Sequence, residues 1–168
     1  MQSQIEQLIK LKDTWMASHV TEAEFPTPLS QKGLALYQSQ QQSSELISSV
    51  SDNSALSLSV YPVDCHPLTI RYSVVLSSKW ESESDKEAML EYLTQIMFEE
   101  DSPARLFIGF FKGKPAACGM IFQSEEDLAL IADVHALPLN NQQDLISEME
   151  KQLFTIASGE KQSVAINR

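Results

Sequence analysis

Two stretches of sequence decide the fold predicted for this chain: LFIGFFKGKPAACGMIF (residues 106–122) and LALIADVHALP (residues 128–138). The first holds two apolar runs joined by the turn 112–115, and the acidic turn 123–127 leads into the second. Apolar runs separated by short polar or glycine-containing turns are typical of antiparallel hairpins. Residues 106–138 are therefore predicted to form a three-stranded antiparallel meander that Pro138 closes and a helix follows.

Regular elements are also expected on both sides of the meander. Helices are indicated where apolar residues recur every three or four positions, and Ser84 with Glu87 has the spacing of a capping box. Strands are indicated where β-branched and aromatic residues gather. Helices are expected at 4–19, from about 29, at 85–98 and at 145–156, strands at 68–76 and 163–166, and a helix end, loop and edge strand within the Gln/Ser-rich stretch 38–59. The predicted class is α+β, with a mixed, mostly antiparallel sheet and flanking helices.

Length and composition restrict the possible classes of protein. A chain of 168 residues is long enough for one well-buried core. We expect a helical N-terminal segment, residues 1–60, that packs on a core formed by residues 61–168. The chain has no apolar run near the about 18 residues of a membrane span and no secretory signal, which predicts a cytoplasmic protein.

Charge and cysteine content exclude further classes. Twelve basic and 23 acidic residues give a net charge of −11, which disfavours binding to nucleic acids and to anionic membranes. Cys65 and Cys118 lie far apart without a CxxC motif, so free thiols are expected, with neither a disulfide nor a metal site. Cys118, inside an apolar run, is expected to be a small core residue.

The meander resembles the central motif of the GCN5-related N-acetyltransferase (GNAT) superfamily. LFIGFFKGKPAACGMIF is similar to the second and third strands of that family, including the Gly-Lys-Pro turn and a small residue at Gly119, and LALIADVHALP is similar to its fourth strand. The resemblance covers about residues 70–168 and implies a GNAT-like fold that uses acetyl-CoA to acylate an amine. It also implies that the fourth and fifth strands splay apart. Backbone groups from about Asp133 to Leu137, including Val134 and Ala136, would then bind the pantetheine arm.

The loop after Pro138 departs from the family pattern. In the family, a loop of the type Gln/Arg-x-x-Gly-x-Gly/Ala holds the pyrophosphate at a helix N-terminus, because glycines let backbone N–H groups approach the phosphates. No lysine or arginine occurs between Lys114 and Lys151, and a carboxylate at Asp144 would oppose an anion. The alternative is ordinary helix capping by Asn140, Asn141 or Asp144. Counted from Pro138 without a gap, residues 139–144 match the family loop and hold no glycine. By resemblance, the residues that would bind the cofactor here are Asn140, Asn141, Gln142, Gln143, Asp144 and Leu145.

Asp133 and His135 are the candidate catalytic residues. Two positions apart on one strand, they would face the same side and could act as general bases in the cleft. The alternative is that both face solvent while Ala132, Val134 and Ala136 face the core. The run Asp64-Cys65-His66 suggests a nucleophile, but adjacent residues on a strand point to opposite faces, and a loop thiol is the alternative.

Three functions are consistent with these patterns. The first is a degenerate acetyltransferase-like binding module with an impaired acyl-CoA loop, which binds a small-molecule amine or a basic protein. The second is an active N-acetyltransferase, and the third is a structural or regulatory subunit of a homo-oligomer. The acidic stretches 81–85, 99–101 and 125–127 would attract an amine or a basic partner, or are solvated turns. A strand at 163–166 leaves an open sheet edge, which predicts a homodimer or an N-terminal segment that covers the edge.

Overall fold

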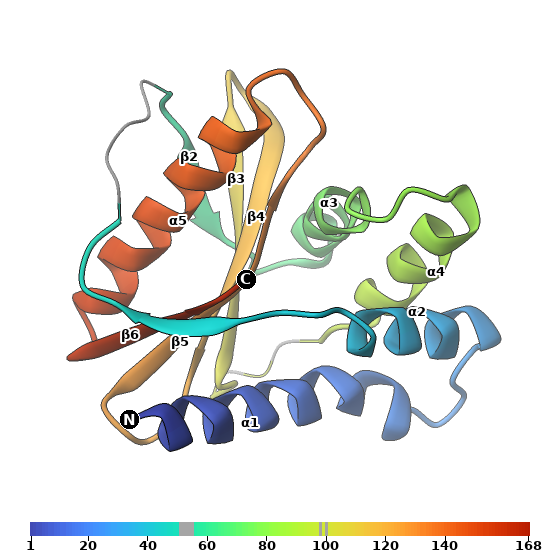
Figure 1. The fold of residues 1–168 in the computed structure, drawn as a ribbon. Helices are drawn as coiled ribbons and strands as arrows, with labels where there is room; N and C mark the ends of the chain where they lie inside the picture. Colours follow the sequence, from blue (N-terminus) through green and yellow to red (C-terminus); the bar gives the residue numbers. More distant parts are fainter. Residues whose placement is uncertain (51–55, 98, 100) are drawn as a thin grey trace.

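The computed structural model describes residues 1–50, 56–97, 99 and 101–168. Short runs of helices and of strands follow one another along this part of the chain in an α+β arrangement (Figure 1). No helix among the described residues combines the length and the apolar character that crossing a membrane requires. The helices are α1 (Gln2–Thr21), α2 (Pro28–Gln38), α3 (His66–Ser77), α4 (Glu83–Leu93) and α5 (Gln142–Ser158), and the strands are β1 (Ser44–Ile47), β2 (Ser59–Pro62), β3 (Ala104–Phe111), β4 (Lys114–Gln123), β5 (Leu128–Ala136) and β6 (Ser163–Asn167).

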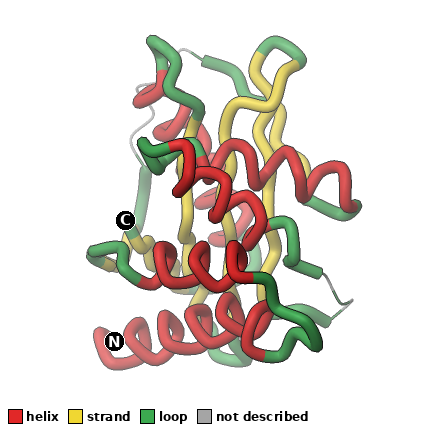
Figure 2. Tube along the Cα trace, turned by 90° about the vertical axis from the view of Figure 1, so that its right-hand side faces the viewer, coloured by secondary structure: helices red, strands yellow, loops and turns green. Residues whose placement is uncertain are grey.

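The six strands form one sheet in the order β1-β6-β5-β4-β3-β2. Strands β5 and β6 pair in parallel, and the other neighbouring strands pair antiparallel. Helix α5 covers one face, and helices α1 to α4 gather on the other (Figures 1 and 2). The predicted class, a mixed and mostly antiparallel sheet with flanking helices, is confirmed.

The predicted meander is confirmed as β3, β4 and β5. Its first hairpin closes at the pair Phe111–Lys114, which leaves a two-residue loop. Lys112 and Gly113 in this loop have φ values of 51° and 78°. Positive φ at both loop residues is the requirement of a turn that matches the twist of paired strands, and glycine meets it without steric cost. Cys118 is fully buried in β4, as expected of a small core residue.

The strand predicted at residues 68–76 is wrong, because this stretch lies in α3. Pro67 lies in the first turn of the helix, where a missing N–H costs nothing. The buried residues Thr69, Tyr72 and Leu76 recur at helical spacing. Packing of this stripe against the sheet overrides the β propensity of the sequence. The strand that pairs with β3 is instead β2.

The helix predicted at residues 85–98 begins and ends earlier than expected. Its N-cap is Ser82, whose side chain accepts a hydrogen bond from the backbone N–H of Asp85, so the predicted cap at Ser84 is wrong. At the other end, the Thr94 hydroxyl donates to the carbonyl oxygen of Leu90, and the helix ends at Leu93. Residue 98, part of the predicted helix, lies outside the described residues.

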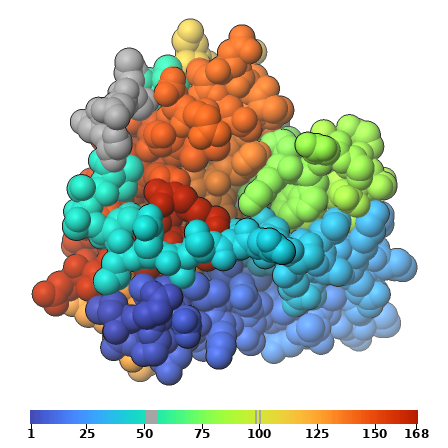
Figure 3. Space-filling model, in the orientation of Figure 1, coloured from blue at the N-terminus to red at the C-terminus, as the bar shows by residue number. Residues whose placement is uncertain are grey.

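The N-terminal segment completes the sheet. Strand β1, from the Gln/Ser-rich stretch, pairs antiparallel with β6 and covers the edge that the sequence left open. Figure 3 shows the stretch that contains β1 lying along β6 and above α1. Of the two predicted ways to cover the edge, the N-terminal one is confirmed, and the homodimer stays a prediction. The division of the chain near residue 60 also stays a prediction, and residues 51–55 of this stretch lie outside the described part.

Candidate functional site

Strand β5 contains a β-bulge at its centre. In its pairing with β4, Cys118 lies opposite His135 and Met120 opposite Ala132, so two residues of β5 face the single residue Gly119. The first of the two, Asp133, has a φ of 58°, in the left-handed region that few residues other than glycine adopt. Bulges bend a strand and redirect side chains, and backbone strain of this kind gathers at functional sites.

The pairing of the two parallel strands stops just before this bulge. β5 and β6 pair from Leu128–Ser163 to Ile131–Ile166, and the pairing ends there. A pocket of about 400 Å³ lies beyond the last pair. This pocket lies where the resemblance implied a gap between the two strands, and the splaying itself stays a prediction. Polar residues that line the pocket are Gln42, Lys79, Asp133, Gln143, Ser147, Glu150, Asn167 and Arg168.

A buried chain of hydrogen bonds holds the Asp133 side chain. Its Oδ2 accepts from the Tyr37 hydroxyl at 2.8 Å, and the Tyr37 oxygen accepts from Lys12 Nζ at 3.2 Å. Lys12 is 1% exposed, and its Nζ also lies 3.0 Å from an oxygen of Asp13. Burial and then the charge of Asp133 raise the pKa of Tyr37 well above its usual value. Tyr37 therefore stays protonated and donates to the carboxylate.

Sequence reasoning missed Lys12 and Tyr37 as parts of this site. Lys12 lies on the same helical stripe as the buried residues Leu8 and Met16. A lysine on an apolar stripe is a signal that could have been noticed, because a buried ammonium group needs a partner. The contact of Tyr37 with Asp133 spans 96 positions of sequence, and no local pattern predicts it.

The two predicted catalytic residues lie on the same side of the sheet, toward helices α1 to α4. The Asp133 side chain reaches Tyr37 of α2, and His135 pairs with Cys118, which belongs to the core on that side. Asp133 is 5% exposed, so the alternative in which both side chains face solvent is wrong for Asp133. A catalytic role for the pair stays a prediction.

His135 has the character of a neutral base. Burial, aided by the charge of Lys79, lowers the pKa of His135 to about 4, so its imidazole is uncharged at neutral pH. Its Nε2 is buried and has no hydrogen-bond partner among the described residues. Burial and the neighbouring Asp133 raise the pKa of the Cys118 thiol, which excludes a thiolate there.

The charges in the pocket are partly neutralised by each other. Arg168 donates to both oxygens of Glu150, at 3.3 and 2.9 Å, and to Glu45 at 2.9 Å. These bonds raise the pKa of Arg168, the bond to Glu150 most of all. Lys79 Nζ donates to the side chain of Gln40 at 2.7 Å. Lys79 and Asp133 thus remain as opposite charges in the pocket lining.

Asn167 presents an unsatisfied acceptor. Its Nδ2 donates to the carbonyl oxygen of Ser43 at 3.3 Å, and its Oδ1 is buried without a hydrogen-bond partner among the described residues. Buried polar atoms in folded proteins are nearly always paired, so each exception requires an explanation. A bound donor group is one explanation, because Asn167 lines the pocket.

The strand residues expected to bind pantetheine are only partly available. Val134 lines the pocket. The carbonyl oxygen of Ala136 already accepts from the side-chain amide of Gln142 at 2.9 Å, and the Leu137 N–H donates to Ala116 at 2.9 Å. Two of the expected backbone groups are therefore engaged within the protein.

The loop after Pro138 leads into a helix whose first turn carries a carboxylate. Helix α5 begins at Gln142, and its N-cap residue Asn141 makes no capping hydrogen bond with its side chain, so the expected cap there is not formed. Asp144, an exposed carboxylate, lies in the first turn. Of the loop residues expected at a cofactor, Gln143 lines the pocket, Leu145 is fully buried in the core, and Asn140 is exposed.

Known proteins resemble this chain in fold but not detectably in sequence. The sequence matches no protein-family model and no curated protein. The fold is similar to that of a GCN5-related N-acetyltransferase from Kribbella flavida, with a TM-score of 0.46, 11% identity, and coverage of 81% of this chain and 54% of that one. It is also similar to a functionally unknown conserved protein from Staphylococcus epidermidis ATCC 12228, with a TM-score of 0.47, 14% identity, and coverage of 83% and 47%. This chain thus spans about half the length of either protein.

Side chains that commonly bind metal ions are not clustered in the described part of the chain. No group of three or more His, Cys, Asp or Glu side chains there is placed to hold an ion. Cys65 is exposed at the N-terminus of α3, beside His66, the first residue of that helix.

Proposed function

We propose that this protein is a binding module with an acetyltransferase-like fold, and that its pocket between β5 and β6 binds a small amine. The proposal rests on the buried Oδ1 of Asn167, which has no hydrogen-bond partner among the described residues and lines the same pocket as Asp133. The Asn167 amide oxygen and the Asp133 carboxylate both accept hydrogen bonds, and an ammonium group supplies up to three donors. A volume of about 400 Å³ is in the range of small-ligand pockets.

The other charges of the pocket favour an amine that also carries an anionic group. Lys79 and the side-chain amide of Gln143 belong to the lining and can donate to a carboxylate. Arg168 and Glu150 neutralise each other and leave Lys79 and Asp133 for the ligand. A zwitterion of the amino-acid type matches both signs.

Acyl-CoA is a poor match for the same region. The loop at residues 139–145 lacks glycine, and the nearest basic residues in sequence are Lys114 and Lys151. Asp144 would oppose the pyrophosphate, at a cost on the order of 1 to a few kcal/mol at surface-like dielectric. Gln142 also occupies the Ala136 carbonyl oxygen that a pantetheine amide would need.

An N-acyltransferase is the second candidate function. It is favoured by the end of the pairing between β5 and β6 and by the uncharged imidazole of His135, which can accept a proton. In that case Asp133 or His135 would act as the base toward the amine. Release of free thiol from acetyl-CoA in the presence of an amine tests this candidate.

Titration calorimetry separates the two candidates. The titrants are acetyl-CoA, a panel of amino acids and the corresponding amines without a carboxylate. We expect binding of at least one amine and no binding of acetyl-CoA below millimolar concentration. Micromolar binding of acetyl-CoA that survives moderate salt, with no binding of amines, would contradict the proposal.

Two substitutions locate the binding. Asn167→Ala removes the acceptor and should weaken amine binding about tenfold or more, because a hydrogen bond to a charged group is worth about 1.5–3 kcal/mol. Asn167→Asp keeps the shape, adds a negative charge and should tighten binding. Asn140→Ala, in the exposed loop, is the matched control and should leave the affinity unchanged.

A further inference from the structure

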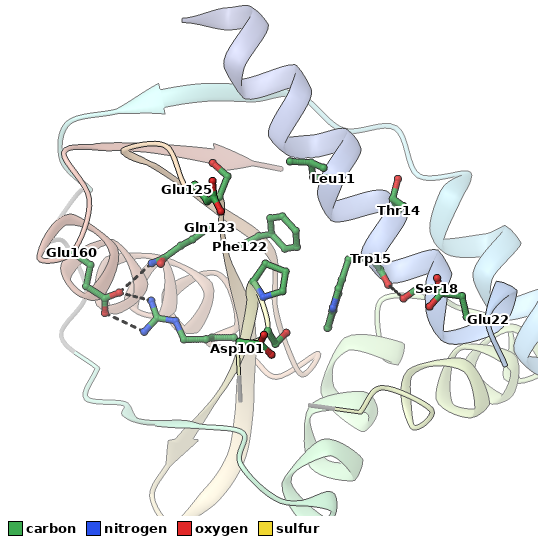
Figure 4. A pocket seen from close by; sticks show the side chains of 14 residues that line it. Leu11, Thr14, Trp15, Ser18, Glu22, Asp101, Phe122, Gln123, Glu125 and Glu160 are labelled. Atoms are coloured by element: carbon green, nitrogen blue, oxygen red, sulfur yellow. Dashed lines mark hydrogen bonds and ion pairs between the residues drawn. The ribbon is translucent and has the colours of Figure 1, made fainter. Parts of the chain in front are cut away.

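A second hollow lies between α1 and the ends of β3 and β4, away from the pocket of the proposed function (Figure 4). Its volume is about 900 Å³. Helix α1 forms one wall with Leu11, Trp15 and Glu22. Phe122 and Glu125 belong to the opposite wall. We call this hollow the α1 groove.

The two walls of the α1 groove meet through apolar side chains. The Trp15 ring is half-buried and lies 6.4 Å from the Phe122 ring, measured between centroids. Leu11 is 53% exposed and projects from α1 beside them (Figure 4). Pro103 extends the apolar surface. Large exposed apolar side chains that gather beside a hollow mark an interaction site more often than scattered ones do.

The rim of the α1 groove is acidic. Glu22, Asp101 and Glu125 line it, and none of them has an ion-pair partner among the described residues. The basic residue Arg105 is held by Glu160 through two hydrogen bonds of 3.0 and 2.8 Å, which also lower the pKa of Glu160. The rim therefore keeps three carboxylates whose charge is not neutralised by any residue that the structure describes.

The groove is also elongated. A neighbouring hollow of about 410 Å³ shares Trp15, Glu22 and Asp101 with the α1 groove. It is also lined by Met97, which is 80% exposed. Together, the apolar hollow and this more polar neighbour offer more length than one small molecule requires.

We propose that the α1 groove docks a basic segment of a partner protein, in which an aromatic or aliphatic side chain lies between lysines or arginines. The apolar anchor would pack on Trp15, and the basic residues would face Glu22 and Glu125. Docking of an amphipathic segment into a groove is a recurring mode of recognition, and opposite charges accelerate association. A second copy of this chain is a poorer occupant, because each copy carries a net charge of −11. This inference is independent of the β5–β6 pocket.

Tryptophan fluorescence reports on the groove directly. The chain has two tryptophans, so Trp80→Phe leaves Trp15 as the only one. The probe is a tryptophan-free 14-residue peptide of lysine and leucine in an amphipathic helical pattern. We expect a saturable blue shift of Trp15 emission as the peptide covers the ring. An unchanged Trp15 emission would overturn the proposal, as would a shift that grows with protein concentration when no peptide is present.

Matched variants show whether the groove or the overall charge binds the peptide. Glu22→Gln with Glu125→Gln should weaken binding about tenfold or more. Glu6→Gln with Asp64→Asn makes the same change in net charge at exposed positions outside the groove lining and should weaken binding less than twofold. Equal losses in the two double variants would mean nonspecific attraction and would overturn the proposal.

The apolar anchor has its own control. Leu11→Ser removes an apolar side chain of the groove, and Leu139→Ser removes one that is 48% exposed and lies outside the groove lining. We expect Leu11→Ser alone to weaken peptide binding, by about fivefold. Equal affinities of these two variants would contradict an apolar contact in the groove.

Discussion

The two faces of the sheet are held by different interactions. On the face toward α5, the core is formed by apolar side chains such as Leu145, Met149 and Leu153, although α5 also carries the buried Glu148 and Glu150. On the face toward α1 to α4, the apolar core also encloses the hydrogen-bonded chain from Lys12 through Tyr37 to Asp133. Burial of polar groups costs free energy unless each is paired, so such a network fixes one arrangement. The difference places the buried polar network that holds Asp133 on the second face, while the pocket itself is lined from both faces.

Two glycines test how tightly each face is packed. A Cβ at Gly33 in α2 would overlap the carbonyl oxygen of Ala88 and the Cβ of Tyr92, which cannot move independently of α4. A Cβ at Gly119 would overlap mainly the flexible end of Leu153. We expect Gly33→Ala to lower the free energy of unfolding by about 3 kcal/mol and Gly119→Ala by about 1 kcal/mol, as measured by urea denaturation. The reverse order would contradict the close α2–α4 contact.

Removal of the Tyr37 hydroxyl tests the buried hydrogen-bond network from Lys12 to Asp133. Tyr37→Phe leaves Asp133 Oδ2 without its donor and removes one partner of Lys12 Nζ. A buried acceptor left without a hydrogen bond costs about 1–3 kcal/mol, so the free energy of unfolding should fall by about 2 kcal/mol. Tyr61→Phe is the control, because Tyr61 is 53% exposed. Equal stabilities of the two variants would mean that the hydrogen bonds from Lys12 through Tyr37 to Asp133 contribute nothing to the free energy of unfolding.

Substitution of Asp133 separates stability from binding. Asparagine tolerates a positive φ and can still accept from Tyr37, so Asp133→Asn should lower the free energy of unfolding by about 1 kcal/mol or less. Asp133→Ala loses the acceptor and should cost more. Both variants lack the carboxylate and should bind amines at least tenfold more weakly in calorimetry. Undiminished amine binding by Asp133→Asn would remove Asp133 from the site.

Acidification should loosen the polar face through two half-buried histidines. Burial lowers the pKa of both His19 and His135 to about 4, from an ordinary value of 6.5. The unfolded chain therefore binds more protons than the folded protein as the pH falls below 6.5. The stability that comes from neutral histidines is fully present above pH 6.5 and is lost as the pH falls toward 4.

Urea denaturation at several pH values between 7.5 and 4 measures this loss. The double variant His19→Gln, His135→Gln should have a flatter dependence of stability on pH than the original chain. An unchanged dependence would contradict burial of the two imidazoles.

The sequence predicted the parts of the fold that rest on local patterns. The meander, α5 and β6 follow from apolar runs, turns and helical spacing within a few residues of each other. The helix α3 was missed because its β-branched residues favour a strand in isolation, and only packing decides otherwise. The cover of the β6 edge by β1 was left as one of two alternatives, because pairing of Glu45 with Ile166 spans most of the chain.

The candidate site was predicted only in part. Asp133 and His135 were found because polar residues interrupt an apolar strand. The bulge that turns Asp133 toward Tyr37 has no signature in the sequence, since no glycine occupies the strained position. Tyr37 and Asn167 come from opposite ends of the chain, and only the folded sheet brings both to the neighbourhood of Asp133.

The central claim, that the β5–β6 pocket binds amines and the adjoining loop does not hold acyl-CoA, is tested most directly by NMR. Uniformly ¹⁵N-labelled protein is titrated with acetyl-CoA and with the best amine from calorimetry. We predict saturable shifts of the amide signals of Asp133, Val134 and Asn167 with the amine, and unchanged signals of residues 140–144 with acetyl-CoA. Saturable shifts of residues 140–144 at micromolar acetyl-CoA, with no response to amines, would contradict the claim.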